Sequence, residues 1–174
     1  MVRTSPSYEG TVAAIIVARG MTPALRSLLD ALDKQSRLPD QLIVCDVRAP
    51  RTSPLSSGQV IVAEDLPEGA LLFSAGRTRN LSDTLAKLAK DKECGQSLQD
   101  HDWLWVLHDD CEPSPNCLEE QLKAAGQGPS IAAVTPKIFR PDGTLCELGI
   151  HATSSGRRVP EVFDGEIDQG QYDG

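Results

Sequence analysis

The 174-residue sequence contains no hydrophobic run near the roughly 18 residues that a membrane-spanning helix needs, so we expect no such helix within it. Aromatic residues are scarce, with two Trp, two Tyr and three Phe, and the core should therefore be mainly aliphatic. Basic residues number 17 against 25 acidic ones and form no cluster. The net charge of −8 argues against nucleic acid or an anionic lipid surface as a partner. An anionic ligand would need a local device such as a metal ion.

The cysteines also exclude one class of protein. Their odd number, five, without the spacing of a disulfide framework, favours reduced thiols over a secreted disulfide scaffold. The first ten residues lack the apolar stretch of a signal peptide. We therefore expect a cytoplasmic protein, while membrane association through parts outside this chain stays open. The length suits one domain, which can bury about 70% of its unfolded surface without a disulfide or metal.

Apolar runs alternate with amphipathic segments along the chain. Strands are predicted at residues 11–18, 41–47, 60–63, 103–108 and 131–135, helices after Thr22, over 79–90 and after Ser114, and a hairpin at 137–150. The polar residues 90–102 are expected to form a surface connection, and the acidic residues 161–174 a loop. This order predicts an α/β fold with an open, mostly parallel sheet that binds its ligand at the carboxyl ends of the strands.

Three polar features fall at those strand ends. Arg19-Gly20 follows the first strand, Asp46 ends the second, and His108-Asp109-Asp110 ends the fourth. Two adjacent carboxylates after a buried strand suit a shared divalent cation, because hard cations prefer carboxylate oxygen. A solvated turn in which Asp109 caps nearby backbone explains them equally well.

Other readings of these residues compete. Asp46 is either a ribose-binding acid of the kind found after the second strand of nucleotide-binding folds or a simple turn residue. Arg19 could contact a base or a phosphate, or face solvent. The sequence has neither GxGxxG after its first strand nor a P-loop, which disfavours dinucleotide and P-loop chemistry. A zinc site of His108, Cys111 and Cys117 is disfavoured because their spacing matches no strong zinc motif.

The order of motifs resembles a known family. The successive segments VAAIIVARG, ALDKQSRLPDQLIVCDV, SAGRTRNLSDTLAKL, WLWVLHDDCEPSPNCLEEQL and IAAVTPKIFRPDGTLCELG look like those of family 2 glycosyltransferases with the GT-A fold. The resemblance covers about Gly10 to Gly149. It implies a bacterial-type enzyme of cell-wall or polysaccharide biosynthesis that transfers a sugar from a nucleoside-diphosphate sugar to an acceptor hydroxyl with inversion.

The resemblance also implies roles for single residues. Asp46 would contact the base or ribose, and Arg77 and Asn80 would match an R-x-x-N segment that borders the nucleotide. Arg19 belongs to Ala18-Arg19-Gly20, which replaces the polar pair usual in the family, so the identity of the donor base stays open.

The residues after the fourth strand would match the family's D-x-D motif. Asp110 would be the ligand of Mn²⁺ or Mg²⁺, and Asp109 its neighbour on the nucleotide side. His108 stands where the family most often has the first aspartate, so an imidazole would make the ribose contact there. The metal would stabilise the charge that develops on the departing nucleoside diphosphate.

The resemblance divides the chain into an extension (1–10), a GT-A nucleotide-sugar-binding domain (11–150) and an acidic loop-like tail (151–174) that would begin an acceptor half. The general base of the family lies further along the chain, so no catalytic residue is predicted before Gly174. Two alternatives stay open: a non-catalytic module or fragment that binds nucleoside diphosphates without this base, and an unrelated α/β interaction domain.

Overall fold

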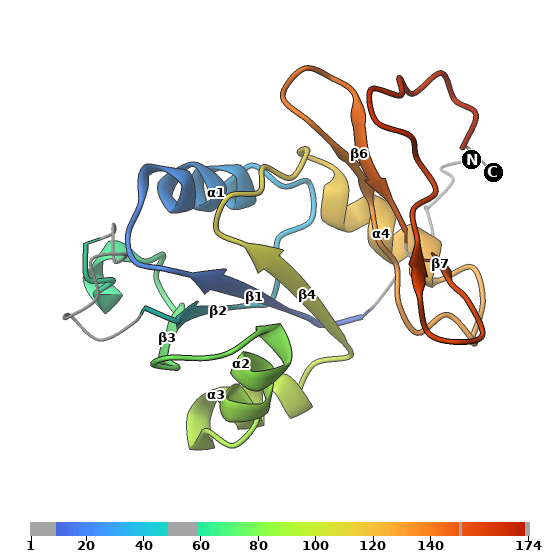
Figure 1. Cartoon of the computed structure of the whole chain (residues 1–174). Coiled ribbons are helices and arrows are strands. Elements are labelled where there is room, and N and C mark those ends of the chain that lie inside the picture. Colours follow the sequence, from blue (N-terminus) through green and yellow to red (C-terminus); the bar gives the residue numbers. More distant parts are fainter. Residues whose placement is uncertain (1–9, 49–58, 150, 173–174) are drawn as a thin grey trace, which may run out of the picture. The chain divides into compact units, whose positions relative to one another are not determined.

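The computed structural model describes residues 10–48, 59–149 and 151–172 (Figure 1). It divides into two compact units, Met1–Leu122 and Lys123–Gly174. The predicted domain boundary at residue 150 stays a prediction. No helix in the described ranges is both long enough and apolar enough to cross a lipid bilayer.

The first unit is built on a four-stranded parallel sheet. Its strands are β1 (Val12–Ala18), β2 (Gln41–Asp46), β3 (Leu71–Ser74) and β4 (Trp103–His108). They lie in the order β3-β2-β1-β4. Ala18 is in register with Asp46, Asp46 with Ser74, and Val17 with His108, so the four carboxyl ends meet at one edge. The predicted α/β class and mostly parallel sheet are confirmed.

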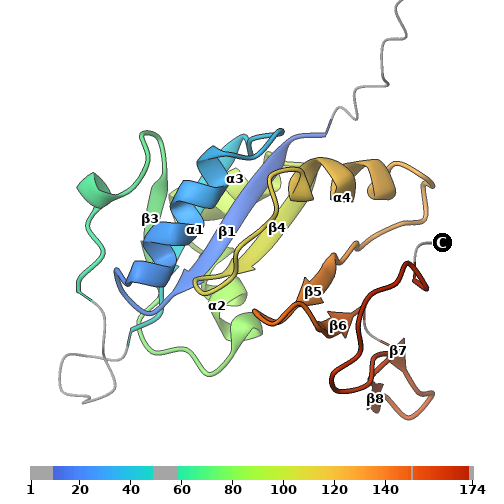
Figure 2. The same cartoon turned by 90° about the horizontal axis from the view of Figure 1, so that it is seen from above.

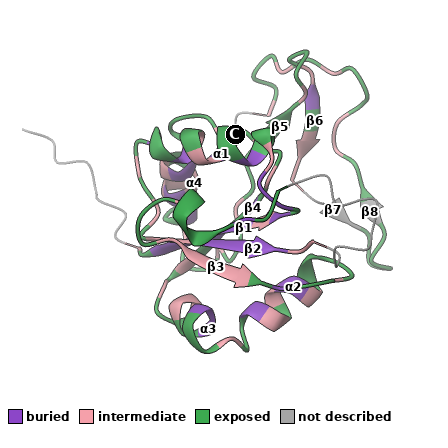
Figure 3. Ribbon diagram, turned by 90° about the vertical axis from the view of Figure 1, so that its left-hand side faces the viewer, coloured by how far each residue is buried: buried purple, intermediate pink, exposed green. Residues whose placement is uncertain are grey.

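Helices cover both faces of this sheet. Helix α1 (Pro23–Asp33) lies on one face, where Figure 2 shows it running along the strands, and the first turns of α4 (Cys117–Ala125) pack into the same core. Helices α2 (Leu81–Leu88) and α3 (Lys92–Gln99) cover the other face. The central strands β1 and β2 are the most completely buried (Figure 3).

Alternate side chains of β1 fill the two cores. Ala14 and Ile16 pack on the α1 side with Leu25 and Leu28, while Ile15 points to the α2 and α3 side. This two-residue period is that of any strand, and both sets are apolar because both faces are covered. Trp103 and Trp105 of the neighbouring strand β4 both contact the α1-side core.

The start of α1 is set by two neighbouring residues. Thr22 accepts a hydrogen bond from the Leu25 backbone N–H at 3.1 Å, and Pro23 occupies the first helical position. Proline suits that position because its missing N–H would have no partner in the helix anyway. The helix predicted directly after Thr22 is confirmed.

The third strand was predicted in the wrong place. Residues 60–63 form no strand: Val60 and Val62 are exposed, and a short 3-10 helix, η1 (Ala63–Asp65), follows. The strand is instead β3, which pairs with β2 just after Gly69. Short apolar runs do not reveal from sequence alone which of them finds a partner strand.

Helix α3 lies where a surface connection was predicted, so that prediction was wrong. Asp91 caps it by accepting the backbone N–H groups of Glu93 and Cys94, and Cys94 is buried. A Cβ at Gly95 would lie 2.6 Å from the carbonyl oxygen of Ala89, so glycine lets α3 begin close to the end of α2. The segment is too polar for its periodicity to identify it as a helix.

The second unit contains the predicted hairpin. Its strands β5 (Lys137–Phe139) and β6 (Leu145–Leu148) are antiparallel, and Gly143 has the positive φ of 83° that favours glycine at the turn. Two short strands, β7 (His151–Ala152) and β8 (Arg158–Val159), follow as a second antiparallel pair.

Two further predictions fall in the second unit. Residues 131–135 form neither strand nor helix, so the predicted fifth strand is wrong; Ala132 and Ala133 are exposed, and apolar composition alone does not supply a pairing partner. Residues 151–160 of the tail that was predicted to be loop-like contain β7 and β8. The described part of the acidic segment 161–174, residues 161–172, is a loop as predicted. It is attached to the hairpin by the Lys137–Asp168 ion pair at 2.8 Å and by the Leu145 N–H, which donates to the Glu166 carbonyl at 2.8 Å.

Candidate functional site

The carboxyl edge of the parallel sheet gathers most of the predicted site residues within the first unit. Arg19 follows β1, Asp46 ends β2, and the acidic pair Asp109-Asp110 follows β4. In an open α/β sheet this edge is where ligands bind.

The turn after β1 is joined directly to the acidic pair. The backbone N–H of Arg19 donates to Asp109 Oδ2 at 3.1 Å. Gly20 follows with φ of 102°, a conformation that a side chain would strain, and this explains the glycine at the bend between β1 and α1. The Arg19 guanidinium is exposed and has no partner among the described residues.

The acidic pair occupies the two central positions of a turn. The backbone N–H of Cys111 donates to the carbonyl oxygen of His108 at 3.2 Å, which closes the turn around Asp109 and Asp110. Asp109 caps the backbone N–H of Arg19, which is one of the two roles that the sequence predicted for it. Asp110 is exposed and has no hydrogen bond or ion pair with a described residue. Its carboxylate is therefore available to a ligand.

The loop after the acidic pair is anchored at its far end by a residue that sequence reasoning missed. Gln35 is only 6% exposed; its Nε2 donates to the Ser114 carbonyl at 2.7 Å, and its Oε1 accepts the Leu118 N–H at 3.2 Å. The Ser36 N–H donates to the Pro115 carbonyl at 2.7 Å beside it. No sequence signal identifies Gln35, because it follows α1 among other polar residues.

Arg48 is the second residue that sequence reasoning missed, and it pairs with Asp46. The Arg48 Nε donates to both carboxylate oxygens of Asp46, at 2.9 and 2.8 Å, and Nη2 lies 2.6 Å from Oδ2. The Arg48 backbone N–H also donates to Oδ1 at 3.1 Å. Asp46 is thus an ion-paired, buried carboxylate rather than a free strand-end acid.

Arg77 and Asn80 follow β3 on the same side of the sheet. Asn80 caps α2 by accepting the Asp83 N–H at 2.9 Å, so part of its amide has a structural task. Lys87 Nζ donates to the Arg77 carbonyl at 2.9 Å and holds the intervening loop. The Arg77 guanidinium is exposed and unpaired among the described residues.

The chemistry of these groups limits how a metal could bind. The described residues contain no group of three or more His, Cys, Asp or Glu side chains that could hold an ion. Burial raises the pKa of the Cys111 and Cys117 thiols. One or two carboxylates do fit Mg²⁺ or Mn²⁺ bound mainly by substrate phosphates and water.

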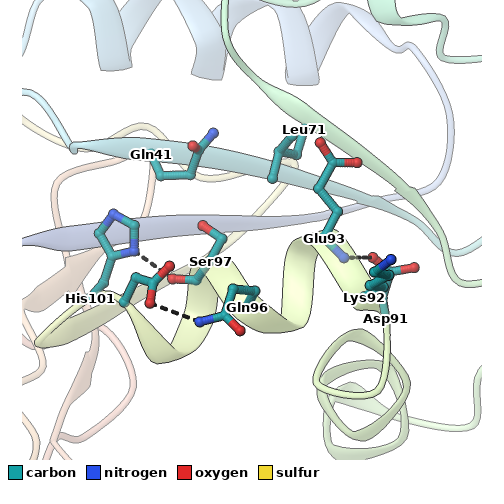
Figure 4. A pocket seen from close by; sticks show the side chains of 9 residues that line it. Gln41, Leu71, Asp91, Lys92, Glu93, Gln96, Ser97 and His101 are labelled. Atoms are coloured by element: carbon teal, nitrogen blue, oxygen red, sulfur yellow. Dashed lines mark hydrogen bonds between the residues drawn. The ribbon is translucent and has the colours of Figure 1, made fainter.

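An open hollow of about 740 Å³ lies at the other end of the same sheet (Figure 4). It is lined by the first residues of β2 and β3, Gln41 and Leu71, and by residues of and around α3. Its polar groups are used locally: Gln96 Nε2 donates to Asp100 at 2.9 Å, and Asp91 caps α3. Its position at the amino ends of the strands makes it the weaker candidate, despite its volume.

Comparisons with known proteins show that the chain is similar to glycosyltransferases. Residues 87–170 match the model of the family described as Glycosyl transferase family 2. The chain is 29% identical over 138 residues to "Galactofuranosyltransferase GlfT1" of Mycolicibacterium smegmatis (strain ATCC 700084 / mc(2)155). That alignment covers 78% of this chain and 42% of the relative, so the chain spans less than half of the relative's length. No solved structure matches the chain significantly.

Proposed function

The family match and the galactofuranosyltransferase relative support a family 2 glycosyltransferase domain in this chain, and we propose that its carboxyl-edge site binds a nucleoside-diphosphate sugar. The parallel sheet with helices on both faces and a separate hairpin is consistent with a GT-A-like fold. The proposed reaction is transfer of the sugar to a glycan hydroxyl with inversion. The relative's name makes a galactofuranosyl donor the first to test.

The observation that carries this proposal is the pair Asp109-Asp110 in its turn. Asp109 is fixed against the Arg19 N–H while Asp110 is exposed and unpaired among the described residues. Asp110 would hold Mn²⁺ or Mg²⁺, with Asp109 on the nucleotide side. The ion, when bound, would stabilise the charge on the departing diphosphate.

The surrounding residues would bind the rest of the donor. The exposed guanidinium groups of Arg19 and Arg77 offer positive charge at an edge of an otherwise acidic chain, and His108 and Asn80 would border the nucleotide. Because an anion approaching a −8 protein is repelled on average, these local cations and the metal would have to supply the attraction.

The chain aligns with only 42% of its relative, so the use of a glycan acceptor and of a general base further along the chain is proposed for the whole protein and not for this segment alone. A cytoplasmic location is proposed from the cysteines, all five of which are unpaired in the structure. The second candidate is a nucleotide-binding module without turnover. Donor turnover in the presence of an acceptor distinguishes it from the enzyme.

Calorimetric titration with UDP, GDP, ADP and dTDP, with and without Mn²⁺, tests the binding step. We expect binding of at least one nucleotide to require Mn²⁺. Asp110→Ala should weaken that binding by about 100-fold, because the ion loses its protein carboxylate. Asp30→Ala removes an exposed carboxylate of α1 and serves as the charge-matched control, with expected changes below twofold.

Two results would contradict the proposal. One is binding that is absent for every nucleotide at millimolar concentration, which leaves the chain an α/β interaction domain. The other is metal-dependent binding that Asp110→Ala leaves intact, which moves the metal site elsewhere.

A further inference from the structure

A buried ion pair lies at the end of β2, and its two members differ in how accessible they are to a ligand. Asp46 is the acceptor and Arg48 the donor, joined through Nε and Nη2 of the guanidinium. The Asp46 side chain is 7% exposed and the Arg48 side chain 21% exposed. The arginine is therefore the more accessible member.

Arg48 already uses most of the hydrogen-bonding capacity of the Asp46 carboxylate. An ionised carboxylate offers about four acceptor sites, two on each oxygen. Oδ1 accepts the Arg48 backbone N–H, Oδ2 accepts Nη2, and the single Nε–H is shared between both oxygens. A ribose hydroxyl or a base N–H would therefore compete with Arg48 for a side chain that is only 7% exposed.

Arg48 keeps donors to spare. A guanidinium carries five N–H groups in a rigid fork, and the contacts with Asp46 use the edge formed by Nε and Nη2. Nη1 and the second N–H of Nη2 have no hydrogen-bond partner among the residues that the structure describes. Because the fork is fixed by Asp46, a ligand would find these donors already oriented, which lowers the entropic cost of binding.

The strand order indicates which part of the donor would lie here. β2 is separated from β4 by β1, a span of about 10 Å at normal strand spacing. The acidic pair after β4 is the proposed diphosphate site, and the Arg48 side chain is turned back onto Asp46 rather than toward it. A nucleoside diphosphate extends over two strand spacings, so its nucleoside end would reach β2.

We propose that Arg48 contacts the nucleoside part of the donor and selects its base, while Asp46 is a positioning residue that orients Arg48. This inference rests on the proposed function and changes the role that the family resemblance implies for Asp46. The ligand groups that Arg48 would take are the carbonyl oxygens and ring nitrogens of a base, which accept paired hydrogen bonds from a guanidinium. Its flat face can also stack on the base.

The test compares nucleoside diphosphates with inorganic pyrophosphate, each measured with Mn²⁺ by calorimetry. In the wild type, UDP, GDP, ADP and dTDP should bind with unequal affinity. Arg48→Gln should weaken the preferred nucleotide about tenfold or more and the pyrophosphate less than twofold, so that the bases become nearly equivalent. Arg26→Gln, at an exposed position of α1, is the matched control and should change neither.

Two more variants separate contact from positioning. Asp46→Asn should weaken the preferred nucleotide less than Arg48→Gln does, and the double variant should be no weaker than Arg48→Gln alone, because both changes act through one guanidinium. Arg48→Lys keeps the charge beside Asp46 and, if Arg48→Gln unfolds, still tests whether the fork itself is needed: base discrimination should fall with lysine as well.

The inference is overturned if Arg48→Gln leaves the preferred nucleotide unchanged, or tightens it by freeing Asp46 for the ribose. An equal loss for pyrophosphate would also overturn it, because that result assigns Arg48 to the phosphates. If the wild-type protein binds no nucleotide, the proposed function fails first and this inference with it.

Discussion

The two edges of the parallel sheet use their acidic residues differently. At the amino edge, Asp40 accepts the Val12 N–H at 2.8 Å and Arg37 Nη2 at 2.6 Å, and Asp102 accepts the Thr11 N–H and hydroxyl at 2.9 and 3.0 Å. At the carboxyl edge, Asp110 has no partner among the described residues. The two amino-edge acids thus both hold β1, whereas the carboxyl edge combines two partnered acids, Asp46 and Asp109, with Asp110, which faces outward.

The pKa values agree with this division. Burial alone would raise the pKa of Asp40, but hydrogen bonds from Arg37 and the Val12 backbone lower it below its ordinary value. The Thr11 backbone N–H and hydroxyl lower the pKa of Asp102 in the same way. Hydrogen bonds that favour the charged form identify carboxylates with a structural task, so the comparison assigns a stabilising role to the two amino-edge acids. Ligand binding at the carboxyl edge stays a proposal.

Gln35 offers the largest expected effect on stability. Gln35→Leu leaves the Ser114 carbonyl and the Leu118 N–H without their partner and should lower the free energy of unfolding by about 2 kcal/mol in urea denaturation. Nucleotide binding by the folded variant should stay within twofold, because the acidic pair is held separately by the Arg19 N–H and the turn at His108.

Gln96→Leu is the control for that experiment, since Gln96 is exposed on α3, and it should change stability by less than about 0.5 kcal/mol. If Gln35→Leu weakened metal-dependent binding more than tenfold, the far end of the loop would also determine the position of the acidic pair. The comparison of the two edges would then need to include this loop.

A smaller effect is expected at Asp40. Asp40→Ala should lower stability at neutral pH by about 1 kcal/mol, since the Val12 N–H loses its acceptor in a partly exposed site. The folded pKa lies below the ordinary 3.8, so this contribution is present above that value and fades as pH falls through the folded pKa. Denaturation of both proteins from pH 7 to pH 3 should therefore show their difference shrinking.

Asp33→Ala, at an exposed position of α1, is the control and should follow the wild type at every pH. A difference between Asp40→Ala and wild type that is constant down to pH 3 would mean that the charge of Asp40 contributes nothing. The amino edge would then be held by the neutral hydrogen bond alone.

The sequence predicted the sheet and the residues at its carboxyl edge, because apolar runs such as residues 12–18 and 103–107 and the polar residues that end them are local signals. It placed β3 wrongly and missed α3, because short or polar segments take their structure from the partners they meet. It also missed Arg48 and Gln35. Their roles depend on contacts with Asp46, and with Ser114 and Leu118, that only the folded chain brings about.

Paramagnetic broadening by Mn²⁺ with the bound nucleotide tests the assignment of ligand binding most directly. In a ¹⁵N-labelled sample, with Mg²⁺ as the diamagnetic reference, the amides of Arg19, Gly20, Asp109 and Asp110 should broaden first. The amides of Val12 and Asp40, about 20 Å away along the strands, should broaden least. Broadening centred on α3 and the hollow beside it would contradict the account.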